Sequence, residues 1–364
     1  MEEVKYNIDF WKAFDKTKVT KEHSMFAEFC LPYMKKGEKL LDICCGNFRD
    51  TYFFADKGLI IDAFDYEDFN LEDKKLNFDL IEKFDHVYCR FILHVIPEHL
   101  EDYVLINAHN VLKEGGLFYI EARSNKGEVP INNHYRRLID IEELRNKLLR
   151  LNFKIVFEDE TKGLSVYNNE DPILIRFIVR KSGEIRTRGT LREEKATYRN
   201  PINSVSSMYL LLTTKQIFAD NNIPFFLVYG TLLGAYREKG FIKHDTDIDI
   251  GLLDKYWEQV MALINGGYFA IHGLLYIREE HKKRHLKALQ YKNDWIDFWF
   301  FKKAKEMYKS GRFYNMQAFQ IDDGFSDIDF YGQKFKTVNN IKTYLDRHYP
   351  KGWKIPVKDT HAKF

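Results

Sequence analysis

Alternating aspartates in the second half of the chain are the residues best suited to metal chemistry. Asp245, Asp247 and Asp249 occupy every second position, with Ile248 and Ile250 flanking the last of them. Residues i and i+2 of a β-strand lie on one face, so Asp247 and Asp249 should point the same way. Neighbouring carboxylates repel unless a cation lies between them, and hard oxygen ligands suit Mg²⁺ or Mn²⁺. The spacing predicts a divalent-cation site on Asp247 and Asp249, and it leaves the reach of Asp245 to the ion open.

A Gly-Thr turn precedes these acids. Gly230 and Thr231 follow an apolar strand predicted at 225–229, and a helix is predicted from Thr231 to Arg237. Helix N-termini favour anions, and a glycine lets the backbone approach a ligand closely. We therefore expect Gly230 and Thr231 to bind a phosphate. Arg237 would either steady a leaving group or pair with an acid.

A third carboxylate lies inside an apolar strand predicted at 294–301. Asp297 stands there between Ile296 and Phe298. Burying a carboxylate is costly unless it is paired or binds a metal. The position predicts that Asp297 is a third metal ligand or a general base.

Alternating strands and helices are predicted for the first half of the chain. A helical segment at 1–36 precedes them, and a polar turn is predicted at 113–116. The strands begin with a short one from Lys39 and continue at 59–65, 84–89, 117–121, 153–158 and 173–180, with helices at 51–57, 97–111 and 141–151. This alternation predicts a doubly wound, mostly parallel α/β sheet.

The start of this sheet has the order of a Rossmann-type nucleotide site. The strand from Lys39 runs into a turn at Gly46, a helix follows, and the next strand ends at Asp65. In such folds an acid at the end of the second strand holds ribose hydroxyls. Asp65 is therefore predicted to bind the ribose of a cofactor.

The first half resembles class I S-adenosylmethionine-dependent methyltransferases over about residues 36–182. The matching motifs are Leu41–Asp50, Asp65, Phe84–His94 and Leu112–Gly116. The resemblance implies S-adenosylmethionine as cofactor and a cofactor-binding set of Asp42, Cys44, Gly46, Asn47, Asp65 and Asp79. Two glycines of the family's first motif are replaced, by Cys44 and Phe48. His94 follows the third of the predicted strands and would be either a catalytic base or a packing residue.

The second half resembles the LicD/fukutin family of phosphotransferases, which have a nucleotidyltransferase fold, over about residues 203–358. The matching residues are Gly230–Arg237, Gly240–Ile242, Asp245–Ile250, Ile296–Phe298 and a tail that includes Phe330–Gly332, Tyr344, Tyr349 and Trp353–Pro356. The resemblance implies transfer of a phospho-substituent from a cytidine-diphosphate donor to a sugar hydroxyl of a glycan or lipid-linked saccharide. His244 and Thr246 depart from the family pattern, which commonly has Trp and Asp there.

Composition and charge limit which partners and which cellular location the sequence favours. The 364 residues carry a formal charge of only +2, which gives no basic field for nucleic acid. No apolar run is long enough to span a bilayer, and the charged N-terminus does not read as a signal peptide. The 4 cysteines lack zinc-ligand spacing. These features favour a cytoplasmic protein with free thiols, and leave peripheral association with the inner face of the membrane open.

Together these patterns predict two α/β-class domains. A Rossmann-like, doubly wound methyltransferase-like domain is expected at 1–182, a polar linker at 183–202 and an α+β nucleotidyltransferase-fold, LicD-like domain at 203–364. We expect a bifunctional glycan-modifying enzyme that transfers a phospho-substituent and methylates the product or a nearby group. Two alternatives stay open: the first domain is only a binding or docking module, or the second attaches a nucleotide to a small molecule.

Overall fold

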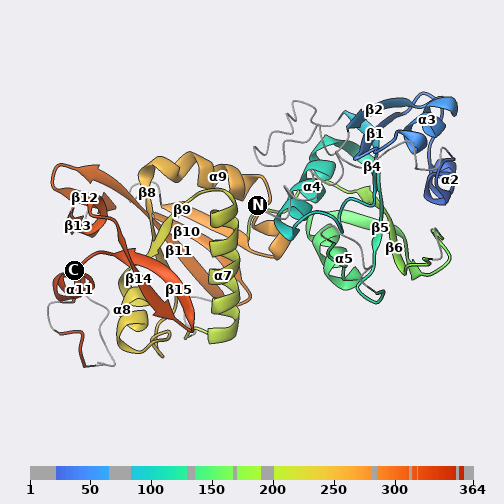
Figure 1. Cartoon of the computed structure of the whole chain (residues 1–364). Coiled ribbons are helices and arrows are strands. Elements are labelled where there is room, and N and C mark those ends of the chain that lie inside the picture. The colour runs from blue at the N-terminus through green and yellow to red at the C-terminus, as the bar shows by residue number, and fades with distance from the viewer. Residues whose placement is uncertain are drawn as a thin grey trace. The chain divides into compact units, whose positions relative to one another are not determined.

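The computed structural model (Figure 1) describes residues 22–64, 83–128, 136–166, 170–189, 201–280, 285–310, 314–317, 319–349 and 352–355. Two predicted cofactor ligands, Asp65 and Asp79, lie outside these residues, as does 190–200 of the predicted linker. The chain divides into two compact units, Met1–Ile185 and Arg186–Phe364. That division falls within the segment expected to be a linker.

The first unit contains a six-stranded sheet within the described residues, with the strand order β2-β1-β3-β4-β6-β5. The strands are β1 (Lys39–Ile43), β2 (Ile60–Phe64), β3 (Phe84–Arg90), β4 (Leu112–Arg123), β5 (Phe153–Thr161) and β6 (Leu174–Lys181). Strands β2, β1, β3 and β4 pair in parallel, whereas β6 is antiparallel to both β4 and β5. The predicted mostly parallel sheet is confirmed.

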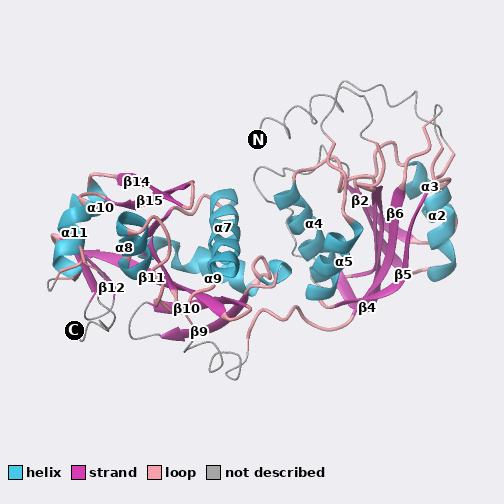
Figure 2. Cartoon of the chain, turned by 90° about the horizontal axis from the view of Figure 1, so that it is seen from below, coloured by secondary structure: helices cyan, strands magenta, loops and turns pink. Residues whose placement is uncertain are grey.

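Helices cover both faces of this sheet. Figure 2 shows α4 (Glu98–Val111) and α5 (Ile141–Arg150) on one face, and α2 (Met25–Cys30) and α3 (Arg49–Asp56) on the other. Strand β1 is almost wholly buried, as expected for a parallel strand between two helical layers. Helix α5 begins where the Asp140 side chain accepts the N–H of Glu143. This is a three-layer, doubly wound fold.

Two predicted elements of the first unit differ from the structure. The predicted turn at 113–116 lies inside β4, but the pairing with β3 jumps from Leu112 to Leu117, so these residues bulge out of the ladder. Residues 1–21 of the helical segment predicted at 1–36 lie outside the described residues, and within the described part Ser24 caps α2 by accepting the N–H of Ala27. Its continuation through Pro32 is a short 3₁₀ turn, Leu31–Tyr33.

The second unit is built on a mixed sheet of nine strands among the described residues. Its main path is β13-β12-β11-β8-β7-β15-β14, and β10 joins β11 to β9. The strands are β7 (Phe225–Leu227), β8 (Ile248–Leu253), β9 (Leu275–Glu280), β10 (His285–Tyr291), β11 (Asp294–Ala304), β12 (Met307–Ser310), β13 (Tyr314–Gln317), β14 (Phe325–Phe330) and β15 (Gln333–Val338). Strand β8 lies between β7 and β11, so the two strands that carry the predicted acids are neighbours.

Helices pack on this sheet and seal an aromatic core. Helix α7 (Ser204–Asp220) packs on β10 and β11, α8 (Tyr229–Arg237) on β8, and α11 (Ile341–His348) on β15. The other helices are α9 (Trp257–Asn265) and α10 (Phe319–Asp322). Phe218 of α7 packs against Phe269 and Phe298 with ring centroids 5.9 and 5.4 Å away. Rings therefore fill much of this core, as the aromatic-rich composition suggests.

Part of the predicted linker is bound to the second unit. Tyr276 of β9 donates its N–H to the carbonyl of Thr187 and accepts the N–H of Gly189, and the Arg188 guanidinium lies over its ring. These contacts extend the sheet edge by one bridge. Among the described residues, no helix combines the length and apolar character needed to cross a membrane.

Candidate active sites

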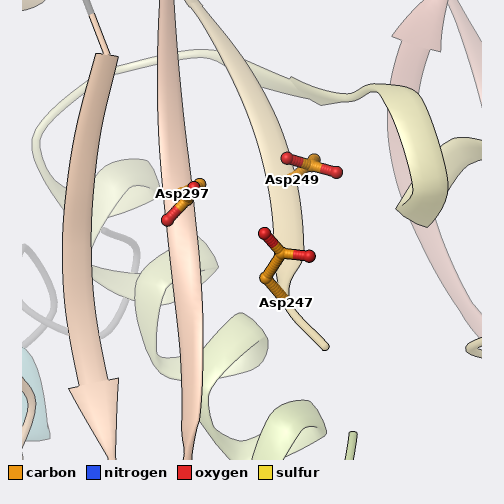
Figure 3. Close-up of side chains that lie close together, drawn as sticks. All are labelled: Asp247, Asp249 and Asp297. Carbon is orange, nitrogen blue, oxygen red and sulfur yellow. The ribbon is translucent and has the colours of Figure 1, made fainter. Parts of the chain in front are cut away.

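Three carboxylates converge on one face of the second sheet. Asp247 directly precedes β8, Asp249 lies within it, and Asp297 lies on the neighbouring strand β11 (Figure 3). The parallel register of β8 and β11 places Asp249 directly beside Asp297. One oxygen of each of the three carboxylates lies within 4.8 Å of the others. The structure therefore brings together the three residues that the sequence suggested as metal ligands.

Burial makes this cluster dependent on a positive charge. The side chains of Asp249 and Asp297 are buried, and Asp247 is half-buried. Burial, followed by the charges of Asp247, Asp297 and Asp245, raises the pKa of Asp249 well above its usual range. A divalent cation would remove this repulsion, and three hard oxygen ligands fit Mg²⁺ or Mn²⁺. The donor set and its electrostatics thus fit a metal site.

Two contacts hold Asp249 in place. Its backbone N–H donates to Thr231 Oγ1 at 2.8 Å, and its Oδ1 accepts the indole N–H of Trp299 at 2.7 Å. The side chain of Thr231 is 1% exposed. Thr231 was predicted to bind phosphate as part of the turn; in the structure its hydroxyl contacts β8 and supports a predicted metal ligand.

The glycine of the turn is required by a close approach from Asp245. A Cβ at Gly230 would lie 2.4 Å from Asp245 Oδ2. Asp245 lies outside the three-carboxylate cluster and accepts the N–H of Thr246. Burial raises its pKa to about 6. The carboxylate of Asp245 thus covers one side of the turn that we predicted to bind phosphate, and α8 begins at Tyr229, two residues before the predicted start.

Arg237 follows the second of its two predicted roles. Its guanidinium forms an ion pair with Glu238 at 2.5 Å and donates to the carbonyl of Trp353 at 2.8 Å. The side chain is 13% exposed. In this structure Arg237 ties the end of α8 to the C-terminal tail.

Trp299 is a site residue that we did not identify from the sequence. It lies two residues after Asp297 on β11, so the two side chains share a face of the sheet. This spacing was a usable signal, but the partner of the indole, Asp249, is 50 positions away in the chain. Only the pairing of β8 with β11 brings them together.

The predicted cofactor loop of the first unit keeps a glycine-like backbone. Cys44, Gly46 and Phe48 have φ angles of 61°, 58° and 61°, in the left-handed region that glycine adopts most easily. Space above Gly46 is open, since a Cβ there would meet no atom within 4 Å. The two residues that replace family glycines thus preserve the loop's shape, which fits a cofactor approaching the backbone.

The remaining predicted ligands of this loop lie beside that turn. Asp42 is buried at the end of β1 and accepts the Thr51 hydroxyl at 2.6 Å. Asn47 is half-buried, and the ring of Phe48 is exposed and packs beside Tyr52. The Phe48 ring therefore turns toward an exposed neighbour on α3.

His94 is held as a packed residue. Its side chain is buried, its ring lies edge-on to Phe91, and its Nδ1 accepts the N–H of Arg123 at 3.3 Å. The lone pair of Nδ1 is therefore occupied, and the ring could act as a base there only by giving up this contact. Of the two roles we left open for His94, the structure favours packing.

Glu121 lies at the carboxyl edge of the first sheet, between two arginines. Arg90 donates to one of its oxygens at 2.8 Å and Arg176 to the other at 2.7 Å. Glu121 is buried, so little water competes for these two contacts. These contacts tie β3, β4 and β6 together.

Comparison with known sequences identifies the second domain. Residues 222–354 match the family described as LicD/FKTN/FKRP, nucleotidyltransferase domain. An uncharacterized protein of Rickettsia typhi is 27% identical over 171 residues, which cover 42% of this chain and 48% of that protein. One of Rickettsia prowazekii is 39% identical over 66 residues, which cover 18% of this chain and 25% of that protein. The chain thus spans half or less of the length of these relatives.

Solved methyltransferases are similar to the first half of the chain. One is the 1,6-didemethyltoxoflavin-N1-methyltransferase of Burkholderia thailandensis, with a TM-score of 0.37 and 16% identity, covering 50% of this chain and 85% of that one. Another is an S-adenosylmethionine-dependent methyltransferase of Methanosarcina mazei, with a TM-score of 0.37 and 15% identity, covering 43% of this chain and 98% of that one. The first unit is Rossmann-like in its sheet topology, and residues 222–354 are similar to the nucleotidyltransferase domain of the LicD/FKTN/FKRP family.

Proposed function

We propose that the second domain transfers a phospho-substituent from a cytidine-diphosphate donor to a sugar hydroxyl of a glycan or lipid-linked saccharide. The convergence of Asp247, Asp249 and Asp297 on two paired strands carries this proposal. The match of residues 222–354 to the LicD family supports a nucleotide-linked donor. With a lipid-linked acceptor, the protein would work at the inner face of the membrane as a peripheral enzyme.

Each acid has a role in this reaction. Asp247 and Asp249 would hold Mg²⁺ or Mn²⁺, and Asp297 would complete the site or accept the proton of the sugar hydroxyl. A bound cation supplies Lewis-acid chemistry, which stabilises charge on the diphosphate oxygens as the phosphoanhydride breaks. The bond between the phosphorus and the acceptor oxygen forms, and cytidine monophosphate leaves. The backbone at Gly230 would contact the donor phosphate.

Substitution of the acids tests this assignment. We expect Asp247→Ala and Asp249→Ala to abolish release of cytidine monophosphate from a cytidine-diphosphate conjugate, measured by mass spectrometry. Asp327→Ala is the matched control, because Asp327 is an exposed acid of β14 paired with Lys336 at 2.8 Å. Undiminished turnover in the two cluster variants would overturn the proposal. Release of pyrophosphate from CTP in place of conjugate cleavage would support the alternative, a nucleotidyltransferase acting on a small molecule.

We propose further that the first domain binds S-adenosylmethionine and methylates the product or a neighbouring group. The left-handed loop at Cys44, Gly46 and Phe48 supports this role, because the backbone there can approach a ligand. Asp42 and Asn47 would flank the cofactor. Calorimetric titration of the full chain with S-adenosylmethionine should give saturable binding. Its absence would leave the first domain as a docking module, without affecting the proposal for the second.

A further inference from the structure

The indole of Trp299 makes a directed polar contact with a predicted metal ligand. The indole N–H donates to Asp249 Oδ1 at 2.7 Å. Trp299 is 7% exposed and Asp249 is 8% exposed, so little water competes for this bond. A hydrogen bond to a buried carboxylate is stronger than one between neutral groups. The contact therefore fixes the rotation of the Asp249 carboxylate.

Aromatic side chains pack around the indole of Trp299. The ring of Tyr229 lies edge-on to Trp299, with centroids 5.2 Å apart. Tyr229 donates its backbone N–H to the hydroxyl of Tyr344 on α11, and His348 stacks on Tyr344 at 4.0 Å. These buried contacts leave the indole little rotational freedom, so the position of its N–H is set before any ligand arrives.

The backbone of Asp249 is anchored as firmly as its side chain. Its N–H donates to Thr231 Oγ1, and its carbonyl accepts the N–H of Val228 at 3.4 Å. With the backbone held at the start of α8 and Oδ1 engaged by the indole, the carboxylate has one defined orientation. Asp297 lies directly beside it on β11.

We propose that Trp299 is a positioning residue for the divalent cation: by donating to Asp249 Oδ1 it orients the carboxylate so that Oδ2 is the oxygen directed at the ion. This inference rests on the metal site of the proposed function. Hydrogen bonds to a metal ligand from residues outside the coordination sphere orient that ligand, and their loss typically weakens metal binding about 10–100-fold. Trp299 does not contact the ion or the substrates in this arrangement.

Metal titration of the full chain tests the role of Trp299. We expect Trp299→Phe, which keeps a ring but removes the N–H, to weaken Mn²⁺ binding roughly 10–100-fold in electron paramagnetic resonance titrations. Trp353→Phe is the matched control, because the Trp353 indole donates to Asp346 Oδ1 at 2.8 Å and Asp346 is not one of the clustered acids. The control should bind Mn²⁺ within about twofold of the wild type. Equal affinity of the folded Trp299→Phe protein would overturn the inference.

A second readout does not depend on the folding of that variant. The chain has 5 tryptophans, so a protein labelled with ¹⁵N-tryptophan gives few indole signals, and Trp→Phe variants at the other four positions assign the Trp299 signal by elimination. Mg²⁺ should shift the Trp299 signal and leave the Trp353 signal in place. A stationary Trp299 signal during saturable metal binding would overturn the inference. Failure of the wild type to bind either ion would instead contradict the proposed function.

Discussion

Asp247→Asn should stabilise the metal-free second unit. The carboxylate oxygens of the cluster lie within 4.8 Å of one another. Two unit charges at that distance repel by about 3.5 kcal/mol at an effective dielectric constant near 20. Because Asp247 is half-buried and Asp249 relieves part of this repulsion through its raised pKa, we expect a gain of about 1–3 kcal/mol in the free energy of unfolding. The same change should remove the stabilisation by Mg²⁺.

Urea denaturation measures both effects. Four of the tryptophans, Trp257, Trp295, Trp299 and Trp353, lie in the second unit, so indole fluorescence reports chiefly on its unfolding. With EDTA at pH 7.5, Asp247→Asn should unfold at a higher urea concentration than the wild type. With Mg²⁺ at a hundredfold excess over its dissociation constant, the wild type should gain about 2.7 kcal/mol and the variant far less. A variant that is less stable than the wild type in EDTA would refute the repulsion argument.

Three other changes test the electrostatics and the backbone. Lys147→Met removes the buried cation that contacts Glu101 and Asp102 at 2.9 Å. It should lower the free energy of unfolding of the first unit by about 3–5 kcal/mol, measured by circular-dichroism denaturation. A loss under about 1 kcal/mol, which is typical of an exposed ion pair, would contradict this prediction. The Phe48→Gly protein should be about 1 kcal/mol more stable to denaturation than the Phe48→Ala protein. Both variants lose the ring, but only glycine adopts a φ of 61° without strain. Equal stabilities of the two variants would mean that the loop is unstrained. Burial raises the folded-state pKa of Asp245 to about 6, above the usual value for an aspartate of about 3.9, so its contribution to stability is present below about pH 4 and is lost as the pH rises through 6. Asp245→Asn in EDTA should flatten that decline in denaturation midpoints, and an unchanged pH profile would rule out this titration.

The sequence patterns predicted the positions of strands and helices more reliably than they predicted the contacts between them. Buried strands such as β1 and β3 were predictable because each contains consecutive apolar residues, Leu40–Leu41 and Val87–Cys89, as expected where helices cover both faces of a parallel strand. Asp297 was identifiable because a carboxylate inside an apolar strand needs a partner or a metal. The bulge at 113–116 was read as a turn, since Gly115 and Gly116 are typical of both.

The support of the site depended on pairings that no local pattern encodes. Thr231 contacts β8 across 18 positions, and Trp299 reaches Asp249 across 50. Asp245 has the same parity as Asp247 and Asp249, but Asp247 directly precedes β8 whereas Asp245 lies three residues before the strand begins at Ile248, too far for its alternation to apply. Parity alone could not show that Asp245 would turn toward Gly230 instead of the cluster.

A crystal structure of the full chain with Mn²⁺ and a cytidine nucleotide tests the central claim most directly. The account predicts one anomalous-scattering peak at the trio Asp247, Asp249 and Asp297, about 2.0–2.4 Å from carboxylate oxygens and in contact with the nucleotide's phosphates. Asp249 should reach the ion through Oδ2 while Trp299 keeps Oδ1. A nucleotide bound without a peak among these three aspartates would contradict the assignment of a metal-dependent phosphotransferase site.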